Sequence, residues 1–184
     1  NDFLEGVDVF VDGLDFFVPE MRSLVFARCY ELGIPAITAG PIGMGAAYLI
    51  FLPNQMNFEQ YFRLAGLPVE QQYVNFLLGL TPTAWHRSYL VDANRLDLAR
   101  RSGPSTVMAC QLCAGIVGIE VMKILLHRQP IYAAPWFHIF DGYLGRYQRG
   151  QLRWGNGGLL QRLKCQLGYR QIERQLAENS GLLT

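Results

Sequence analysis

Two carboxylates close to one glycine are the residues of this chain best suited to chemistry. Asp12, Gly13 and Asp15 follow an apolar run that begins at Val7. Such a run is typical of a buried parallel strand, and ligands bind in the loops after such strands in open α/β sheets. The acid groups could therefore take part in catalysis. The alternative is that they only accept hydrogen bonds within the turn.

A glycine-rich segment is the second candidate for ligand contact. Gly40, Gly43 and Gly45 lie close together, but their spacing is not that of a dinucleotide-binding loop. An apolar run over residues 46–52 follows where a helix should begin. We predict a turn between two strands, and the functional alternative is that backbone amides here approach a ligand.

Cysteine chemistry has weaker support. Cys110 and Cys113 form a Cys-x-x-Cys pair, which could be half of a zinc site. Zinc needs a second pair of ligands, and the remaining cysteines and histidines are isolated from one another, so we expect two small buried thiols and no zinc. Four unevenly spaced cysteines do not suggest a disulfide framework, which favours a reducing, cytoplasmic setting.

The composition indicates one folded α/β domain. The chain has 184 residues, of which 51% are hydrophobic and 17% charged. A net charge of +1 gives no broad field that would attract nucleic acid. Arginines gather between Arg146 and Arg174, where we predict a solvated face.

The elements that must position the carboxylates can be predicted in order. Pro19 and Glu20 start a helix of about four turns that ends near Gly33. With the strand that opens at Val7 and another over residues 34–39, this helix makes a strand–helix–strand unit whose strands run parallel.

The middle of the chain is more polar. Residues 53–103 read as a crossover or insertion with short helices over 57–64 and 68–78, the first capped by Asn57. A helix over residues 107–126 has the length of a membrane span, but Glu120 and Lys123 can pair on one face, so we predict a buried helix and no membrane.

Short strands close the sheet. We predict an antiparallel meander over residues 136–140, 145–148 and 151–154. Residues 156–184 should form a helical tail of one or two helices, with the pattern interrupted at Gly168.

The order of these parts resembles the C-terminal part of a ThiF-type domain, the ATP-dependent fold of ubiquitin-activating enzymes and of the bacterial activators of sulfur-carrier proteins. The resemblance rests on the Asp12–Asp15 loop and its helix, the Gly-Ile-Pro strand, the glycine-rich turn, the helix ending near Leu125, and Phe140-Asp141-Gly142. It implies an α/β fold with a partial doubly wound, Rossmann-like mixed sheet, parallel strands being followed by an antiparallel edge. Residues 1–155 would form the C-terminal part of the nucleotide-binding domain.

The resemblance also implies roles for single residues. Asp15 matches an aspartate that lies near the phosphates of ATP and helps to hold Mg²⁺, a role that suits a carboxylate oxygen. Arg22 matches a catalytic arginine of the following helix if two extra residues are allowed, and Phe16 stands where the family has asparagine. Asp12, Gly13, Gly40 and Gly43 would line the cofactor site. The zinc-binding cysteine pairs of many members have no counterpart here.

The expected function is therefore that of a fragment of an ATP-dependent adenylyltransferase that activates a carboxylate, such as the C-terminus of a ubiquitin-like or sulfur-carrier protein. The glycine-rich nucleotide loop of the family lies upstream of the matching part, so we expect this fragment alone to bind ATP weakly and to be inactive. Its apolar surface should drive homo-oligomerisation. The alternative is a non-catalytic dimerisation or partner-binding module. A nicotinamide-dependent oxidoreductase would share the fold but lacks its fingerprint here.

Overall fold

The computed structural model describes residues 3–89 and 105–181, with side chains up to residue 177. One mixed sheet of five strands forms its centre, in the order β1-β2-β3-β4-β5. The strands are β1 (Phe10–Asp12), β2 (Ala36–Ile42), β3 (Gly45–Phe51), β4 (Trp136–Asp141) and β5 (Arg146–Gln151). β1 and β2 are parallel, and every later pair is antiparallel, which confirms the predicted α/β class and its change of strand direction.

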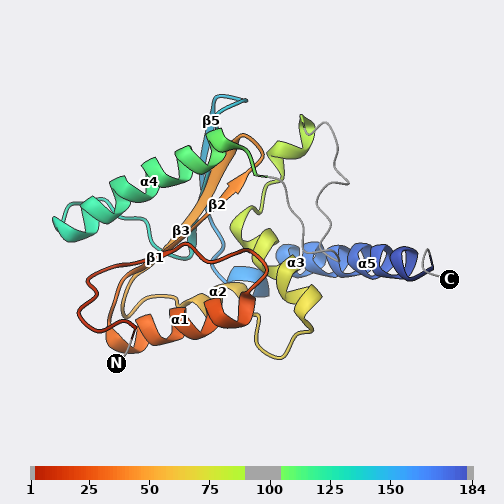
Figure 1. Cartoon of the computed structure of the whole chain (residues 1–184), viewed down its shortest axis with the longest axis horizontal. Helices are drawn as coiled ribbons and strands as arrows, with labels where there is room; N and C mark the ends of the chain where they lie inside the picture. Colours follow the sequence, from red (N-terminus) through yellow and green to blue (C-terminus); the bar gives the residue numbers. More distant parts are fainter. Residues whose placement is uncertain (1–2, 90–104, 182–184) are drawn as a thin grey trace.

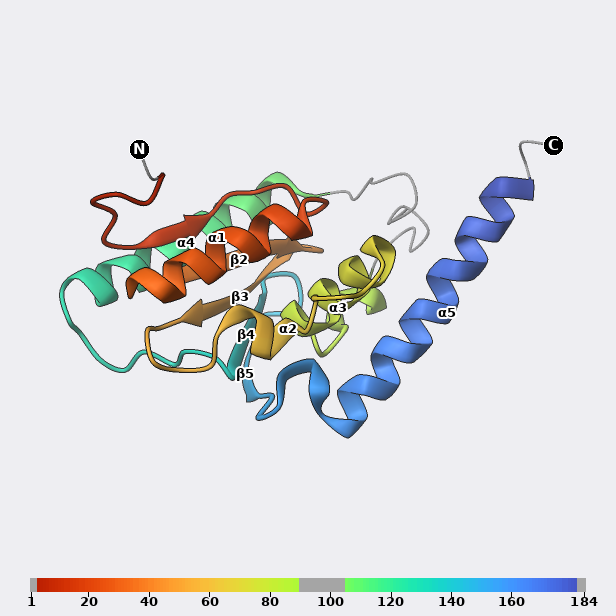
Figure 2. The same ribbon diagram turned by 90° about the horizontal axis from the view of Figure 1, so that it is seen from below.

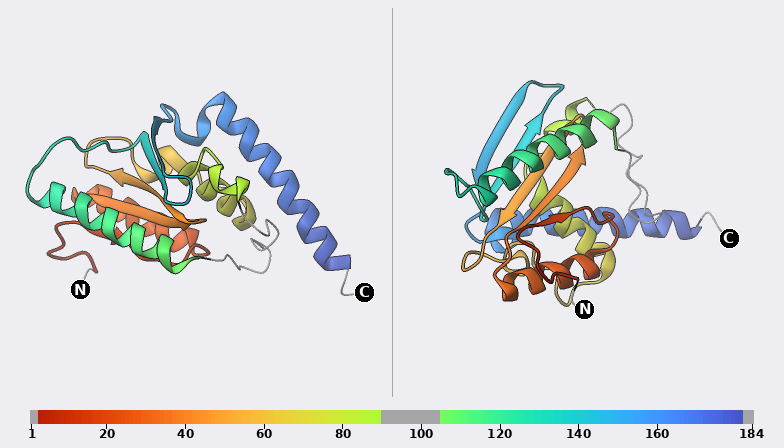
Figure 3. Two further views of the ribbon diagram at one scale, coloured as in Figure 1. Left: turned by 90° about the horizontal axis from the view of Figure 1, so that it is seen from above. Right: turned by 60° about the vertical axis from the view of Figure 1, so that its left-hand side comes forward.

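Helices cover both faces of this sheet, as Figure 1 and Figure 3 show. α1 (Pro19–Leu32), α2 (Phe58–Phe62) and α3 (Val69–Leu80) lie on one side, and α4 (Val107–Leu125) lies on the other. The alternation of β3 supplies both cores, because Leu49 and Phe51 face the first side whereas Tyr48 and Ile50 face α4.

β1 is shorter and more exposed than predicted. Only residues 10–12 pair with β2, and Val11 is 45% exposed at the edge of the described sheet. Residues 7–9 would need partners at 33–35, where Gly33 is in the left-handed conformation that ends α1 and Pro35 has no N–H to donate. The prediction of a buried strand from Val7 is therefore wrong about where the strand begins and about the burial of Val11.

The helix boundaries agree closely with the sequence signals. α1 has Pro19 in its first turn and ends at Gly33, whose φ is 71°. Asn57 accepts a hydrogen bond from the Gln60 amide, and the Gln60 side chain accepts one from the Asn57 amide, which forms a capping box for α2. A short 3₁₀ helix, η1 (Trp85–Ser88), follows α3. The rest of the predicted crossover, residues 90–103, lies outside the described residues.

α4 has its predicted length but is buried on one face only. Ala109, Cys113, Val117 and Glu120 face the sheet, whereas the outer face exposes about half or more of each of its large apolar side chains, which are Val107, Met108, Ile119, Met122 and Leu125. The prediction of a buried helix is wrong for this outer face, which no other described element covers. Glu120 and Lys123 form the predicted pair at 2.7 Å. α4 is long and apolar enough to cross a membrane, a test that core helices also pass.

The end of the chain departs from two expectations. The separate strand predicted over residues 151–154 does not form, because β5 continues to Gln151 and the chain then turns over residues 152–154 into the 3₁₀ helix η3 (Gly155–Gly157). α5 (Leu159–Gly181) runs through Gly168 without a break. A Cβ at Gly168 would lie 2.6 Å from Val74 Cγ1 of α3, so this glycine permits close helix packing and does not interrupt the helix. Beyond this contact α5 projects away from the sheet (Figure 2).

Candidate functional site

The loop after β1 is organised by the buried carboxylate of Asp12. Its Oδ2 accepts hydrogen bonds from Arg22 Nε at 2.6 Å and from Thr38 Oγ1 at 2.8 Å. Its Oδ1 accepts one from the Leu14 amide at 3.0 Å. Asp12 therefore links β1, β2 and α1, and its oxygens are occupied by protein donors.

Arg22 fastens the same loop from the first turns of α1. Its Nη2 donates to the carbonyl oxygens of Leu14 at 2.7 Å and Asp15 at 2.9 Å, and its guanidinium lies 4.5 Å from the centre of the Phe76 ring. The residue is only 2% exposed. This geometry gives Arg22 a positioning function. The predicted direct role in catalysis stays a prediction.

Asp15 differs from Asp12 because it is exposed. Its Oδ1 accepts a hydrogen bond from the Phe17 amide at 2.8 Å, the turn arrangement expected as the alternative to catalysis. An exposed carboxylate oriented by one such bond can still bind an ion. The turn and the predicted magnesium ligation are thus compatible.

Phe16, which stands where the ThiF-type family has asparagine, has a packing role. Its ring centre lies 5.5 Å from that of Phe76 and 6.1 Å from that of Tyr73, both on α3. Phe17 lies 5.2 Å from Tyr73 in the same cluster. The loop is therefore held by a salt bridge on one side and by aromatic packing on the other.

The three candidate glycines have different surroundings. A Cβ on Gly13 would meet no described atom within 4 Å, so the backbone there is open to a ligand. Gly40 faces Leu80, and Gly43 faces His86 and Tyr89. The turn predicted between the two strands is confirmed as the β2–β3 hairpin, with Gly43 at φ 60°. Cofactor binding by these glycines stays a prediction.

A second polar cluster lies beside the β2–β3 hairpin, and it was not predicted from the sequence. Asp141 at the end of β4 is 2% exposed and accepts hydrogen bonds from Tyr89 Oη at 2.8 Å and from the Leu144 amide at 3.0 Å. Tyr89 Oη also accepts one from the Met44 amide at 2.9 Å. Burial raises the pKa of Tyr89, which keeps the phenol protonated as the donor to Asp141. The Asp-Gly pair after a strand was a signal, but its partner lies 52 positions away.

The Cys-x-x-Cys pair is divided by the helix surface. Cys113 is buried against the sheet, and burial raises its pKa to about 12, whereas Cys110 is exposed. The expectation of two buried thiols is wrong for Cys110, which lies off the buried row of α4. Among residues 3–89 and 105–177, no three His, Cys, Asp or Glu side chains gather closely enough to hold a metal.

Comparison with known proteins places this fold. The model of the ThiF family matches residues 1–156. The chain belongs to the ThiF family. None of the curated proteins compared with it matches.

Solved structures agree with this ThiF-family fold. E. coli MccB with ATP is 15% identical at a TM-score of 0.52, covering 86% of this chain and 42% of that one. E. coli MccB with MccA-N7isoASN is 14% identical at a TM-score of 0.53, and the match covers 86% of this chain and 43% of that one. The microcin C7 biosynthetic enzyme MccB with N-formylated MccA is 13% identical at a TM-score of 0.51, and the match covers 86% of this chain and 44% of that one. This ThiF-family chain thus spans less than half the length of these structures.

The described site fits part of the ATP and magnesium chemistry that the family implies. Asp15 offers an exposed hard oxygen, and Mg²⁺ is commonly bound by one or two carboxylates together with phosphates and water. Arg22, the cation of this loop, is engaged by protein oxygens. The loop can therefore supply a ligand for the ion but not the cation that meets the phosphates.

Proposed function

We propose that this chain provides the magnesium-binding edge of an ATP-dependent adenylyltransferase that activates a carboxylate as an acyl-adenylate. The observation that carries the proposal is the exposed Asp15 carboxylate on a loop that Asp12 and Arg22 hold in place. Membership of the ThiF family and the fold shared with MccB, which has been solved with ATP, support it.

The reaction transfers an adenylyl group to the acceptor. A carboxylate oxygen of the acceptor bonds to the α-phosphorus of ATP. The bond between the α-phosphorus and the oxygen that bridges it to the β-phosphate breaks, and pyrophosphate leaves with that oxygen. Mg²⁺, when bound with ATP, neutralises charge on the phosphates. Asp15 would hold that ion through its carboxylate, and Arg22 keeps Asp15 in place by donating a hydrogen bond to its carbonyl oxygen. Gly13 leaves room for the nucleotide to approach the backbone.

The acceptor proposed is the carboxylate of a peptide or of a small carrier protein. MccB has been solved with N-formylated MccA, and the shared fold suggests a comparable place for an acceptor. We place it next to the hairpin that contains Gly40 and Gly43 and the crossover over residues 53–103.

We further propose a cytoplasmic homo-oligomer, since the outer face of α4 exposes apolar side chains that a second copy could cover.

The test is ATP–pyrophosphate exchange by the protein that carries this chain, with a panel of peptide and carrier-protein carboxylates. Asp15→Ala should lower exchange by about 100-fold and raise the magnesium concentration needed. Asp8→Ala removes another exposed aspartate, which precedes β1 whereas Asp15 follows it, and should leave exchange unchanged. Equal exchange in Asp15→Ala and in the unmodified protein would exclude the assigned role.

A non-catalytic partner-binding module is the second candidate. The exposed outer face of α4 and the complete engagement of Arg22 favour it. This candidate predicts a stable oligomer and no exchange with any acceptor. Exchange that depends on Asp15 would rule it out.

A further inference from the structure

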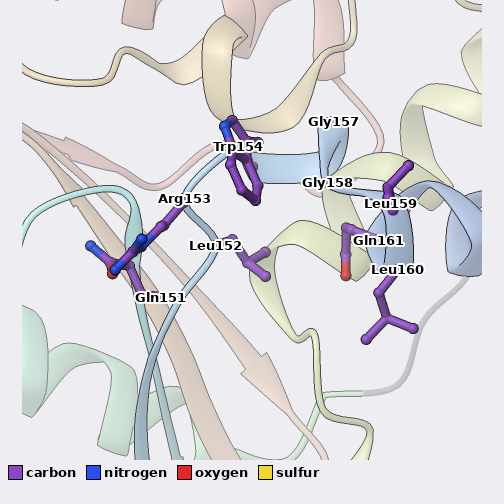
Figure 4. Close-up of a pocket in the computed structure, with 10 residues that line it drawn as sticks. Gln151, Leu152, Arg153, Trp154, Gly157, Gly158, Leu159, Leu160 and Gln161 are labelled. Atoms are coloured by element: carbon purple, nitrogen blue, oxygen red, sulfur yellow. The ribbon is translucent and has the colours of Figure 1, made fainter.

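A groove opens where β5 ends and α5 begins. It has a volume of about 740 Å³ and lies between the β5–η3 turn and the first turn of α5. Figure 4 shows Leu152, Trp154 and Leu160 around it. Trp154 is 69% exposed and Leu160 is 68% exposed. A concave apolar site of this size can accept a large side chain from another molecule.

A row of leucines continues from this groove along α5. Leu159, Leu163 and Leu167 are spaced by four residues, which places them on one face of the helix, and each is more than half exposed. The opposite face of α5 packs through Cys165 and Ile172, both buried. Single exposed leucines are common on protein surfaces, but a contiguous row beside a groove is typical of a binding surface.

The charge of the segment that forms this surface is mostly basic. Residues 152–172 contain no Asp or Glu but contain four basic residues, Arg153, Arg162, Lys164 and Arg170, and the first acidic residue of α5 is the exposed Glu173. Arg170 and Arg174 extend the leucine row by the next helical turns, because they follow Leu167 at intervals of three and four residues. Both arginines are exposed. The surface is thus apolar at its start and basic at its far end.

We propose that the groove and the outer face of α5 form a docking surface for an acidic, amphipathic segment of a partner protein. An apolar side chain of the segment fills the groove beside Trp154, further apolar side chains cover Leu163 and Leu167, and its carboxylates meet Arg170 and Arg174. The ThiF-family match ends at residue 156, so α5 lies beyond the matched part. The inference stands independently of the proposed adenylyltransferase activity.

Two other occupants fit less well. A second copy of this chain would bring the same basic surface against itself in a two-fold contact, which places like charges together. A flat bilayer would satisfy the arginines but would leave the groove unfilled. A polypeptide of opposite charge matches both the concave shape and the charge.

The probe is a synthetic helical peptide with leucines on one face and glutamates following them. A matched peptide carries lysine in place of each glutamate. Binding to the full chain is measured by fluorescence anisotropy and by the blue shift of Trp154 emission on burial, which Trp154→Phe should remove. The glutamate peptide should bind, should bind more weakly in salt, and should bind at least about tenfold more tightly than the lysine peptide.

Variants locate the binding. Leu163→Gln combined with Leu167→Gln, and separately Arg170→Glu combined with Arg174→Glu, should each weaken binding by about tenfold or more. Met21→Gln combined with Leu24→Gln changes a comparably exposed apolar pair on α1 and should not alter it. Equal binding of the two peptides, or no loss in the α5 variants, would overturn the proposal. So would a dimer that the α5 changes dissociate, or binding of phosphatidylserine vesicles without binding of the peptide.

Discussion

Replacing Arg22 by alanine should destabilise the protein strongly. Arg22 and Asp12 form an ion pair of 2.6 Å in which each side chain is 2% exposed. The substitution leaves the Asp12 carboxylate buried without its cation and removes the donors to the carbonyl oxygens of Leu14 and Asp15. Breaking one side of a buried pair typically costs about 3–5 kcal/mol.

This cost can be measured in two ways. Urea unfolding followed by circular dichroism should show the loss of about 3–5 kcal/mol. Since each kcal/mol lowers the Tm of a domain of this size by about 2–4 °C, the Tm should fall by roughly 6–20 °C. Arg22→Lys should cost less but should not restore full stability, because an ammonium cannot bind the carboxylate and the loop carbonyl oxygens as the planar guanidinium does.

Two comparisons make the reasoning refutable. Glu31→Ala breaks an exposed ion pair with Arg28 on the same helix, and should cost less than about 1 kcal/mol. Combining Arg22→Ala with Asp12→Ala should cost about 2 kcal/mol less than the sum of the two single changes. A loss for Arg22→Ala no larger than that for Glu31→Ala would show that the pair does not hold the loop.

Three further predictions concern other parts of the molecule. Gly155→Ala should cost about 3 kcal/mol or more, because the Cβ would lie 2.2 Å from a carbonyl oxygen of α2 and φ is 53°, whereas Gly158→Ala should be nearly neutral in the same unfolding assay. Thiol titration of the native protein should show fast reaction at exposed Cys110 and slow reaction at Cys113, whose pKa burial raises to about 12. Burial lowers the pKa of His138 below its usual 6.5, so the unfolded chain takes up more protons and the free energy of unfolding should fall as pH drops below about 6.5, less steeply in His138→Gln.

The surroundings of His138 explain the direction of this pH effect. Its Nε2 lies 3.0 Å from the carbonyl oxygen of Tyr132, so Nε2 carries the proton and Nδ1 accepts from Tyr147 Oη at 2.8 Å. Burial is the main cause of the lowered pKa of His138, and Arg149 and Lys123 add to it, whereas the hydrogen bond to Tyr132 and the charge of Glu120 act in the opposite direction. His86 also has a lowered pKa and adds to the same trend, which is why the comparison with His138→Gln is needed. An unchanged slope in that variant would contradict the assignment.

Much of the fold could be predicted because its signals are local. Pro19 and Gly33 mark the ends of α1, and Asn57 caps α2 through residues in its own first turn. The two-residue turn at Gly43 and Met44 needs only a glycine that can adopt a positive φ. Each signal acts over a few residues, so the strand–helix–strand unit and the antiparallel edge followed from the sequence, as did the position of Asp15 in a loop.

Tertiary packing decided the rest. The sequence identified Asp12, Asp15 and Arg22 as candidates. Only the structure shows that the Arg22 guanidinium donates its hydrogen bonds to Asp12 and to carbonyl oxygens of the loop, because these partners lie between six and ten positions away. Gly168 looks like a helix break until Val74, far away in the sequence, is found against it. Sequence patterns report what a residue permits locally, whereas burial and hydrogen-bond partners depend on which distant segments the fold brings together.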